Sequence, residues 1–213
     1  MAEFDAPEVT AKDRAAWRRW LQRNHDKIDR VWLVMGKKGA DEPSPTYEEA
    51  VEEALCFGWI DSTMRPVDER RYRQLYSRRK PTSTWSRSNK ERVERLISDG
   101  RMAEAGLAAI ELAKRNGSWA SLDRVEALEV PPDLRAALDS NRVAKRHFEA
   151  FPASIRKQML YRVESAKRPE TRVKRIAEVV DLASRNERPN QPGRPEGRDI
   201  TSARREGVEP PSF

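Results

Sequence analysis

Basic and aromatic side chains gather with a few hydroxyl, amide and acid groups between Trp59 and Asn89. A guanidinium group binds phosphate or carboxylate through two parallel hydrogen bonds, and an aromatic face stacks on planar rings or cations. The pattern therefore indicates a site for an anionic ligand, either a small molecule or a polyanion. The residues that we expect to contact the ligand are Trp59, Asp61, Arg78, Arg79, Lys80, Ser83, Trp85, Ser86 and Asn89.

The net charge of the chain has its source in the same region. Residues 65–95 contain eleven Lys or Arg and four Asp or Glu, a difference that equals the net charge of +7 for all 213 residues. A different interpretation is that the aromatic residues belong to the core and that the arginines extend over them into solvent. The sequence is compatible with both interpretations.

Two residues of this region are candidates for catalysis. Asp61 could act as an acid or base beside an arginine, and Cys56 could act as a nucleophile. However, Cys56 precedes Gly58 at the expected C-terminal end of a helix, whereas a thiolate is stabilised at a helix N-terminus or beside cations. We therefore expect a binding protein, with an enzyme acting on a small anionic substrate as an alternative.

The sequence offers no pattern for a metal or a cofactor. Its two histidines, His25 and His147, and its single cysteine do not have the spacing of zinc ligands. Neither a Walker loop nor a G-x-G-x-x-G motif is present. The acidic cluster Glu48, Glu49, Glu52 and Glu53 has two interpretations, a solvated helix face or a partner for the basic segment.

The elements that must position the site are a helix–strand–helix succession followed by a hairpin. Thr46 and Glu49 form a capping box that opens the second helix, and Ser88 with Glu91 does the same for the helix after the site. Thr10 is the expected cap of the first helix. The expected elements are helices over 11–25 and 46–57, a strand over 30–35, strands over 59–67 and 71–77, and a helix over 88–100.

Every periodic segment after residue 100 has helical spacing. Pro131 and Asn141 begin two of these helices, and Pro169 ends another. The predicted fold is thus α+β, dominated by helices: an N-terminal domain over 1–100 with a short antiparallel sheet of about three strands, and a C-terminal helical bundle over 101–185. Residues 186–213 are rich in Pro, Gly and charge, which predicts a disordered tail.

Composition indicates a cytoplasmic protein. Charged residues make up 36% of the chain, and no apolar run approaches the roughly 18 residues that membrane insertion requires. The N-terminus has no pattern of a signal peptide. A single cysteine excludes an intramolecular disulfide, which fits a reducing compartment. The composition does not indicate an oligomeric state.

Several stretches resemble the YdeI/OmpD-associated family, whose members are also called bacteriocin-protection proteins. The stretch from Glu53 to Asp61 reads Glu-Ala-Leu-Cys-Phe-Gly-Trp-Ile-Asp and carries the resemblance most specifically. Ser62 departs from the pattern, in which glycine is usual at this place. The resemblance covers about residues 14–185, and its other parts are 78–89, 93–106, 117–119, Phe148, 166–172 and 175–176.

The resemblance implies a non-enzymatic cytoplasmic binding protein, linked to protection against bacteriocins or other antimicrobials or to envelope stress. Its motif coincides with the basic and aromatic segment, which favours a ligand site there. A nucleic-acid-binding protein that uses the same residues is an alternative. The sequence shows no signature of a helix-turn-helix, a zinc finger or an RNA-binding domain, so this alternative is less favoured.

Overall fold

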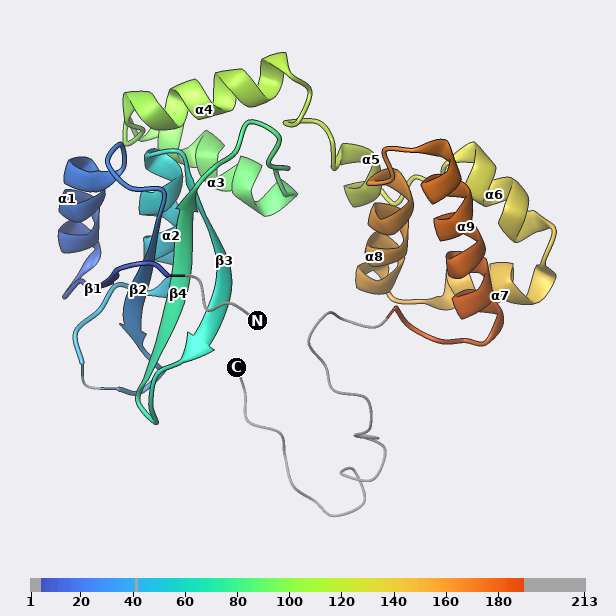
Figure 1. Cartoon of the computed structure of the whole chain (residues 1–213), viewed down its shortest axis with the longest axis horizontal. Coiled ribbons are helices and arrows are strands. Elements are labelled where there is room, and N and C mark those ends of the chain that lie inside the picture. Colours follow the sequence, from blue (N-terminus) through green and yellow to red (C-terminus); the bar gives the residue numbers. More distant parts are fainter. Residues whose placement is uncertain (1–4, 41, 190–213) are drawn as a thin grey trace. The chain divides into compact units, whose positions relative to one another are not determined.

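The computed structural model describes residues 5–40 and 42–189, which form two compact units that divide between Ala127 and Leu128 (Figure 1). Within these residues the first unit contains a sheet and five helices, and the second unit contains helices without a strand. The mixed α+β class predicted from the sequence is confirmed. The predicted tail, 186–213, lies outside the described residues from position 190 onward.

The elements of the first unit begin close to the residues that the sequence indicates. The capping box of Thr46 and Glu49 is present, so this prediction is confirmed. The caps of two other helices are Asp13 and Ser86, so the predictions of Thr10 and Ser88 are wrong. In chain order the elements are β1 (Glu8–Thr10), α1 (Arg14–Asn24), β2 (Arg30–Gly36), α2 (Tyr47–Cys56), β3 (Trp59–Pro66), β4 (Arg71–Arg78), α3 (Arg87–Ser98), α4 (Glu104–Arg115) and α5 (Asp123–Glu126).

The sheet of the first unit has four strands in the order β1-β2-β4-β3, one more than the sequence predicts. The three predicted strands form an antiparallel set, β2-β4-β3. The additional strand, β1, pairs in parallel with β2, and the amide of Trp32 donates to the carbonyl of Pro7 over 2.9 Å. Three residues with one apolar side chain are too few to show a strand period, which is why β1 escapes sequence analysis.

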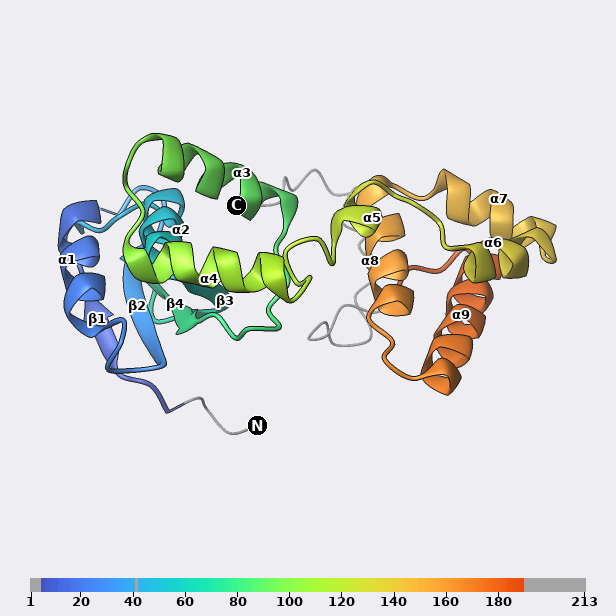
Figure 2. The ribbon, with the colours of Figure 1, turned by 90° about the horizontal axis from the view of Figure 1, so that it is seen from above.

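One face of the sheet forms a core with helices α1 to α4. Val31 faces Tyr76 across the β2–β4 pair, and both are fully buried. They pack in one cluster with Trp17 of α1, Leu55 of α2 and further residues of α3 and α4. Figure 2 shows α2 and α3 together on the same side of the sheet.

Helix α4 belongs to this core because its backbone touches the turn after α2. Gly58 ends that turn with φ +74°, a conformation that favours glycine. The amide of Ala103 donates to the carbonyl of Cys56 over 3.0 Å, and a Cβ atom on Gly106 would lie 2.2 Å from the same oxygen. The first compact unit therefore extends beyond residue 100, where the predicted N-terminal domain ends.

The second unit contains α6 (Pro132–Asp139), α7 (Arg142–Ala150), α8 (Ala153–Glu164) and α9 (Pro169–Ser184). Asn141 caps α7 as predicted. Helix α9 contacts each of the other three. Arg172 of α9 donates to both carboxylate oxygens of Asp133, and these hydrogen bonds raise the pKa of the guanidinium. The predicted helical character of this part is confirmed, whereas its arrangement as a bundle stays a prediction.

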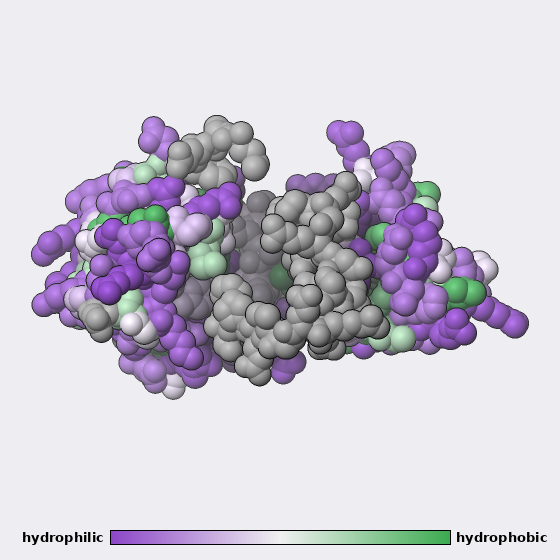
Figure 3. Space-filling model, turned by 90° about the horizontal axis from the view of Figure 1, so that it is seen from below, coloured by the Kyte–Doolittle hydropathy of each residue, from purple (hydrophilic) through white to green (hydrophobic). Residues whose placement is uncertain are grey.

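The surface is mostly hydrophilic. On the face drawn in Figure 3, hydrophilic residues predominate and hydrophobic residues form small separate patches. This agrees with a mean hydropathy of -0.90 for the whole chain. Among the described residues, no helix has the length and apolar character needed to cross a membrane.

Candidate functional site

Arg79 occupies a buried position directly after β4. Its amide donates to the carbonyl of Gly58 over 3.0 Å, which fixes the backbone at the end of the strand. Its guanidinium carbon lies 3.6 Å from the centroid of the Trp85 ring, and Nη1 donates to the carbonyl of Thr84 over 3.0 Å. The side chain of Arg79 is thus oriented both by an aromatic face and by a backbone acceptor.

The other two nitrogen atoms of Arg79, Nε and Nη2, are buried and have no hydrogen-bond partner among the described residues. They form one edge of the guanidinium plane, the edge that can donate to two oxygen atoms of a carboxylate or phosphate. Burial lowers the pKa of Arg79 to about 10, and the negative charge of Asp61 acts in the opposite direction. Arg79 therefore carries its charge at neutral pH while these donors stay unused.

The connector of residues 80–86 is held near this arginine at particular points. The amide of Lys80 donates to Ser83 Oγ over 3.1 Å and closes a turn. The carbonyl of Pro81 accepts from Asn116 Nδ2 over 2.7 Å and from Ser118 Oγ over 3.0 Å. The connector is therefore fastened to the loop that follows α4.

Trp85 also contacts a second aromatic side chain. The ring of Trp119, in the loop that follows α4, lies 5.0 Å from the ring of Trp85. Trp85 itself is buried. Because Trp85 contacts both a cation and a second indole, its fluorescence should report on changes at Arg79.

Asp61 belongs to a second polar group on the helix side of the sheet. It lies opposite Tyr76 in the β3–β4 pair, and one of its oxygens accepts from the Tyr47 hydroxyl over 2.8 Å. Burial and this hydrogen bond raise the pKa of Tyr47 to about 12. The Tyr76 hydroxyl is buried without a partner among the described residues, and burial raises its pKa.

Ser86 and Asn89 form hydrogen bonds at the start of α3. Ser86 Oγ accepts from the amide of Asn89 over 3.3 Å, as an N-cap does. Asn89 is buried, and its Oδ1 accepts from Arg92 over 3.2 Å. Lys80 is exposed. The predicted ligand contacts Arg79, Trp85, Ser83 and Lys80 are thus close along one connector, while Ser86 and Asn89 have structural partners.

Trp59 and Arg78 contact a different part of the first unit. Trp59 is fully buried, and its Nε1 donates to the carbonyl of His25 over 3.3 Å. Arg78 Nη2 donates to the same carbonyl over 3.0 Å and to that of Ile28 over 3.4 Å. Both predicted ligand residues hold the C-terminal end of α1, and the structure does not bring them together with Arg79.

Cys56 is fully buried, and burial raises the pKa of its thiol. A thiol with a raised pKa is a poor nucleophile at neutral pH, because the thiolate is the reactive species. The environment of Cys56 is thus that of a structural residue.

Glu53 contradicts the interpretation of the acidic cluster as a solvated helix face. It is fully buried and makes ion pairs with Arg14 over 2.6 Å, Arg18 over 2.7 Å and Arg101. These three arginines lie outside the basic segment of 65–95. From that segment, Arg95 reaches the cluster, 3.8 Å from Glu52.

Much of the charge of residues 65–95 is neutralised within the first unit. At least six of its eleven cations make ion pairs with described residues, and these are Arg71, Arg73, Arg78, Arg87, Lys90 and Arg95. The field outside the molecule is therefore weaker than the sequence count indicates, and a continuous polyanion track is less favoured.

Two residues near the site are not among the predicted ligand contacts. Tyr47 is the first residue of α2, where the sequence shows only a helix start. Tyr76 meets Asp61 only through the register of β3 with β4, which no local pattern encodes. Over the residues that the structure describes, no cluster of His, Cys, Asp or Glu is arranged to hold a metal ion.

The fold defines a two-unit protein, an α+β unit with a buried arginine and a helical unit. Residues 127–186 match the family model described as bacteriocin-protection, YdeI or OmpD-associated, so the similarity to that family lies in the C-terminal part of the chain. Residues 9–109 match the model of a domain of unknown function (DUF8412). No curated protein and no solved structure matches the chain.

The family predicted from the sequence is thus confirmed, but over a shorter range. The sequence predicts the resemblance over about residues 14–185, whereas the match covers the C-terminal part alone. The stretch from Glu53 to Asp61 lies in the region matched by the domain of unknown function. The candidate site and the family match therefore lie in different units.

Proposed function

We propose that the chain is a non-enzymatic, cytoplasmic binding protein whose first unit holds a small anionic ligand on Arg79. The observation that carries this proposal is the pair of buried guanidinium nitrogens, Nε and Nη2, without a hydrogen-bond partner among the described residues. The family match of residues 127–186 supports a link to bacteriocin protection, and hence to antimicrobial or envelope stress.

The physical argument rests on the cost of an unpaired buried cation. A buried donor that loses water without gaining an acceptor destabilises the fold by about 1–3 kcal/mol, and a charged donor by more. A carboxylate or phosphate would satisfy both nitrogens at once and neutralise the charge. Because Trp85 and Thr84 already orient the guanidinium, a ligand would lose little free energy in ordering it.

Entry of the ligand would require movement of the connector, since Nε and Nη2 are buried. Lys80 and Thr84 are exposed on either side of the turn that Ser83 closes. Lys80 would add a second positive charge near the ligand. Binding is therefore expected to be coupled to a local movement of Thr82 and Ser83, while Pro81 and Thr84 keep their hydrogen bonds.

A thermal-shift titration with inorganic phosphate, citrate and AMP tests the proposal, with sodium chloride at equal ionic strength as the control. At least one anion should raise Tm above its value in sodium chloride and change tryptophan fluorescence, because Trp85 contacts Arg79. Arg79→Met should abolish both responses. Arg87→Met removes the same charge from an exposed position and should leave them intact.

The outcomes separate the proposal from its alternatives. Equal Tm values in every anion and in sodium chloride would contradict it, as would an unchanged response in Arg79→Met. Tight binding of a single-stranded oligonucleotide that weakens steeply with salt would favour a nucleic-acid-binding protein instead. For the biological part, a deletion strain carrying Arg79→Met should survive a bacteriocin less well than one carrying the unchanged chain, and cell fractionation tests the compartment.

A further inference from the structure

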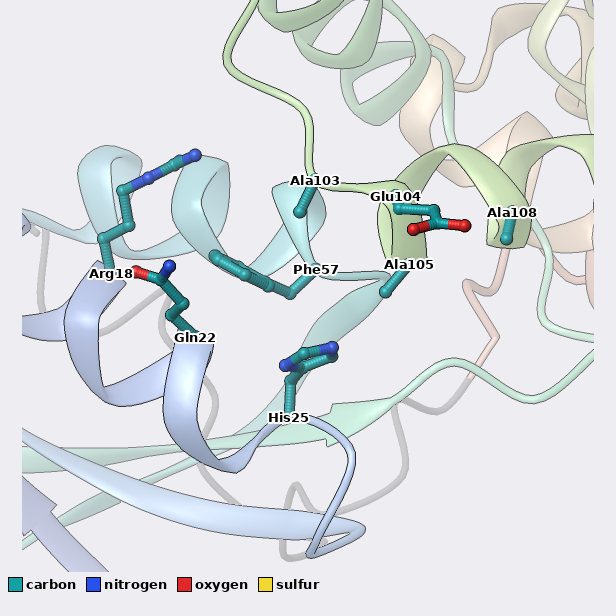
Figure 4. Close-up of a pocket in the computed structure, with 8 residues that line it drawn as sticks. All are labelled: Arg18, Gln22, His25, Phe57, Ala103, Glu104, Ala105 and Ala108. Atoms are coloured by element: carbon teal, nitrogen blue, oxygen red, sulfur yellow. The ribbon is translucent and has the colours of Figure 1, made fainter.

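A cleft of about 600 Å³ opens in the first unit between the end of α1, the turn after α2 and the start of α4 (Figure 4). This volume lies within the range of small-molecule sites, about 300–1,000 Å³. The cleft contains none of the residues of the Arg79 site. Its walls are formed by Arg18, Gln22, His25, Phe57, Ala103, Glu104, Ala105 and Ala108.

Opposite charges come from the two helices that border the cleft. Arg18 belongs to α1, and two of its nitrogens are fixed by Glu53 over 2.7 Å and by the carbonyl of Arg101 over 2.8 Å. Since Glu53 is shared with Arg14 and Arg101, the positive charge of this group exceeds its negative charge. Glu104 is the first residue of α4 and is exposed.

Between these charges the cleft has an apolar floor. Figure 4 shows the ring of Phe57 in the middle, with Arg18 and Gln22 on the α1 side and Ala105 and Glu104 on the α4 side. The guanidinium of Arg18 lies 5.4 Å from the centroid of Phe57. Small alanine side chains leave room beside the ring.

His25 and Gln22 add hydrogen-bonding groups next to this floor. The ring of His25 lies 5.1 Å from that of Phe57, and its Nδ1 is 3.0 Å from the carbonyl of Leu21. A carbonyl can only accept, so Nδ1 carries the proton and Nε2 is left for a ligand. The Gln22 amide can both donate and accept.

We propose that this cleft binds a small zwitterion with an apolar side chain, of the size of an amino acid or a dipeptide. Its carboxylate lies against Arg18 and Gln22, its ammonium group lies against Glu104, and its side chain packs on Phe57 and Ala105. The pairing of a cation on one helix with an acid on the other selects a molecule that carries both charges. A ligand with one charge would leave the opposite wall without a partner.

Isothermal titration calorimetry with L-leucine and L-alanyl-L-leucine tests this proposal. At least one of them should bind, and its N-acetyl derivative and its C-terminal amide should each bind at least tenfold more weakly. Glu104→Gln should lower the affinity for the zwitterion at least tenfold and remove the discrimination against the N-acetyl derivative. Glu111→Gln removes the same charge from the same helix, away from the cleft, and should bind as the unchanged chain does.

Two results would overturn the proposal: no binding of either probe at millimolar concentration, or unchanged affinity in Glu104→Gln. Because Glu104 is exposed, the variant should keep its circular dichroism spectrum and Tm, so a loss of binding would not reflect unfolding. The anion response proposed for Arg79 should persist in Glu104→Gln, so the two sites can fail independently.

Discussion

The guanidinium of Arg79 stacks 3.6 Å above the ring of Trp85, while two of its nitrogens donate to no described residue. Packing thus orients the side chain but leaves two of its hydrogen-bond donors without acceptors. A cation–π contact is worth about 0.5–2 kcal/mol, which does not replace two charged hydrogen bonds. The pair therefore combines rigidity with an unmet hydrogen-bonding capacity, which is what a preorganised binding site requires.

Replacing Arg79 by methionine should leave the free energy of unfolding unchanged or raise it. The apolar side chain keeps the packing on Trp85 and removes buried donors without acceptors, which destabilise the fold by about 1–3 kcal/mol. Loss of the hydrogen bond to Thr84 opposes this by about 1 kcal/mol, and loss of the cation–π contact opposes it by about 0.5–2 kcal/mol. Urea unfolding measures the difference.

Arg79→Ala is the control for this prediction. It removes the same charge but leaves a cavity beside Trp85, so it should lower the free energy of unfolding. A loss of more than about 2 kcal/mol in Arg79→Met as well would show that the arginine stabilises the fold. Its role as an unsatisfied ligand-binding group would then be untenable.

Replacing Glu53 by glutamine should lower the free energy of unfolding by about 3 kcal/mol, since it removes the shared acid of three arginines. This value is at the lower end for buried ion pairs because the arginines themselves can reach solvent. Chemical denaturation measures it. Glu52→Gln, one residue away and partly exposed, should cost less than about 1 kcal/mol. Equal losses in the two variants would contradict the central role of Glu53.

Replacing Ser86 by alanine should lower the free energy of unfolding by about 1 kcal/mol, because its hydroxyl caps α3. Ser86→Asp should retain most of the stability, since aspartate is also a good cap. Ser88→Ala should have little effect, although the sequence pattern favours Ser88. Thermal unfolding of the three variants distinguishes these positions, and a larger loss at Ser88 would refute the assignment.

Above about pH 8.5, Cys56 should make the stability depend on pH. Burial raises the pKa of its thiol, so the folded chain keeps a proton that the unfolded chain loses. The unfolded state then binds fewer protons, and the free energy of unfolding falls as pH rises. In Cys56→Ala this part of the decline should be absent between about pH 8 and pH 10. A difference between the two proteins that does not change with pH would contradict the prediction.

The sequence predicts those elements whose signals are local. The strand over 30–35 and the hairpin strands are recognisable from β-branched and aromatic runs, and the box of Thr46 and Glu49 marks a helix start by itself. The same holds for Asn141 in the second unit. Strand β1 is different, because its three residues become a strand only by pairing with β2.

The site is less predictable because neighbouring residues have different surroundings. Arg78 and Arg79 are indistinguishable in the sequence, yet Arg78 donates to carbonyls at the end of α1 and Arg79 is buried against Trp85. The difference arises because β4 ends at Arg78, so that Arg79 is the first residue outside the strand. The ion pairs of Glu53 are equally difficult to predict, since its partners lie 35 to 48 residues away along the chain. Such contacts follow from the tertiary arrangement and not from a local pattern.

The contact between α4 and the turn after α2 limits which sequences can adopt this fold. The carbonyl of Cys56 lies where any side chain at position 106 would have to begin. In a library that varies every position of the first unit, selection for folded protein should recover glycine alone at 106. Position 56 should accept alanine or serine, because Gly106 approaches the backbone of Cys56 and not its thiol. Homologous sequences that share this unit should show the same asymmetry.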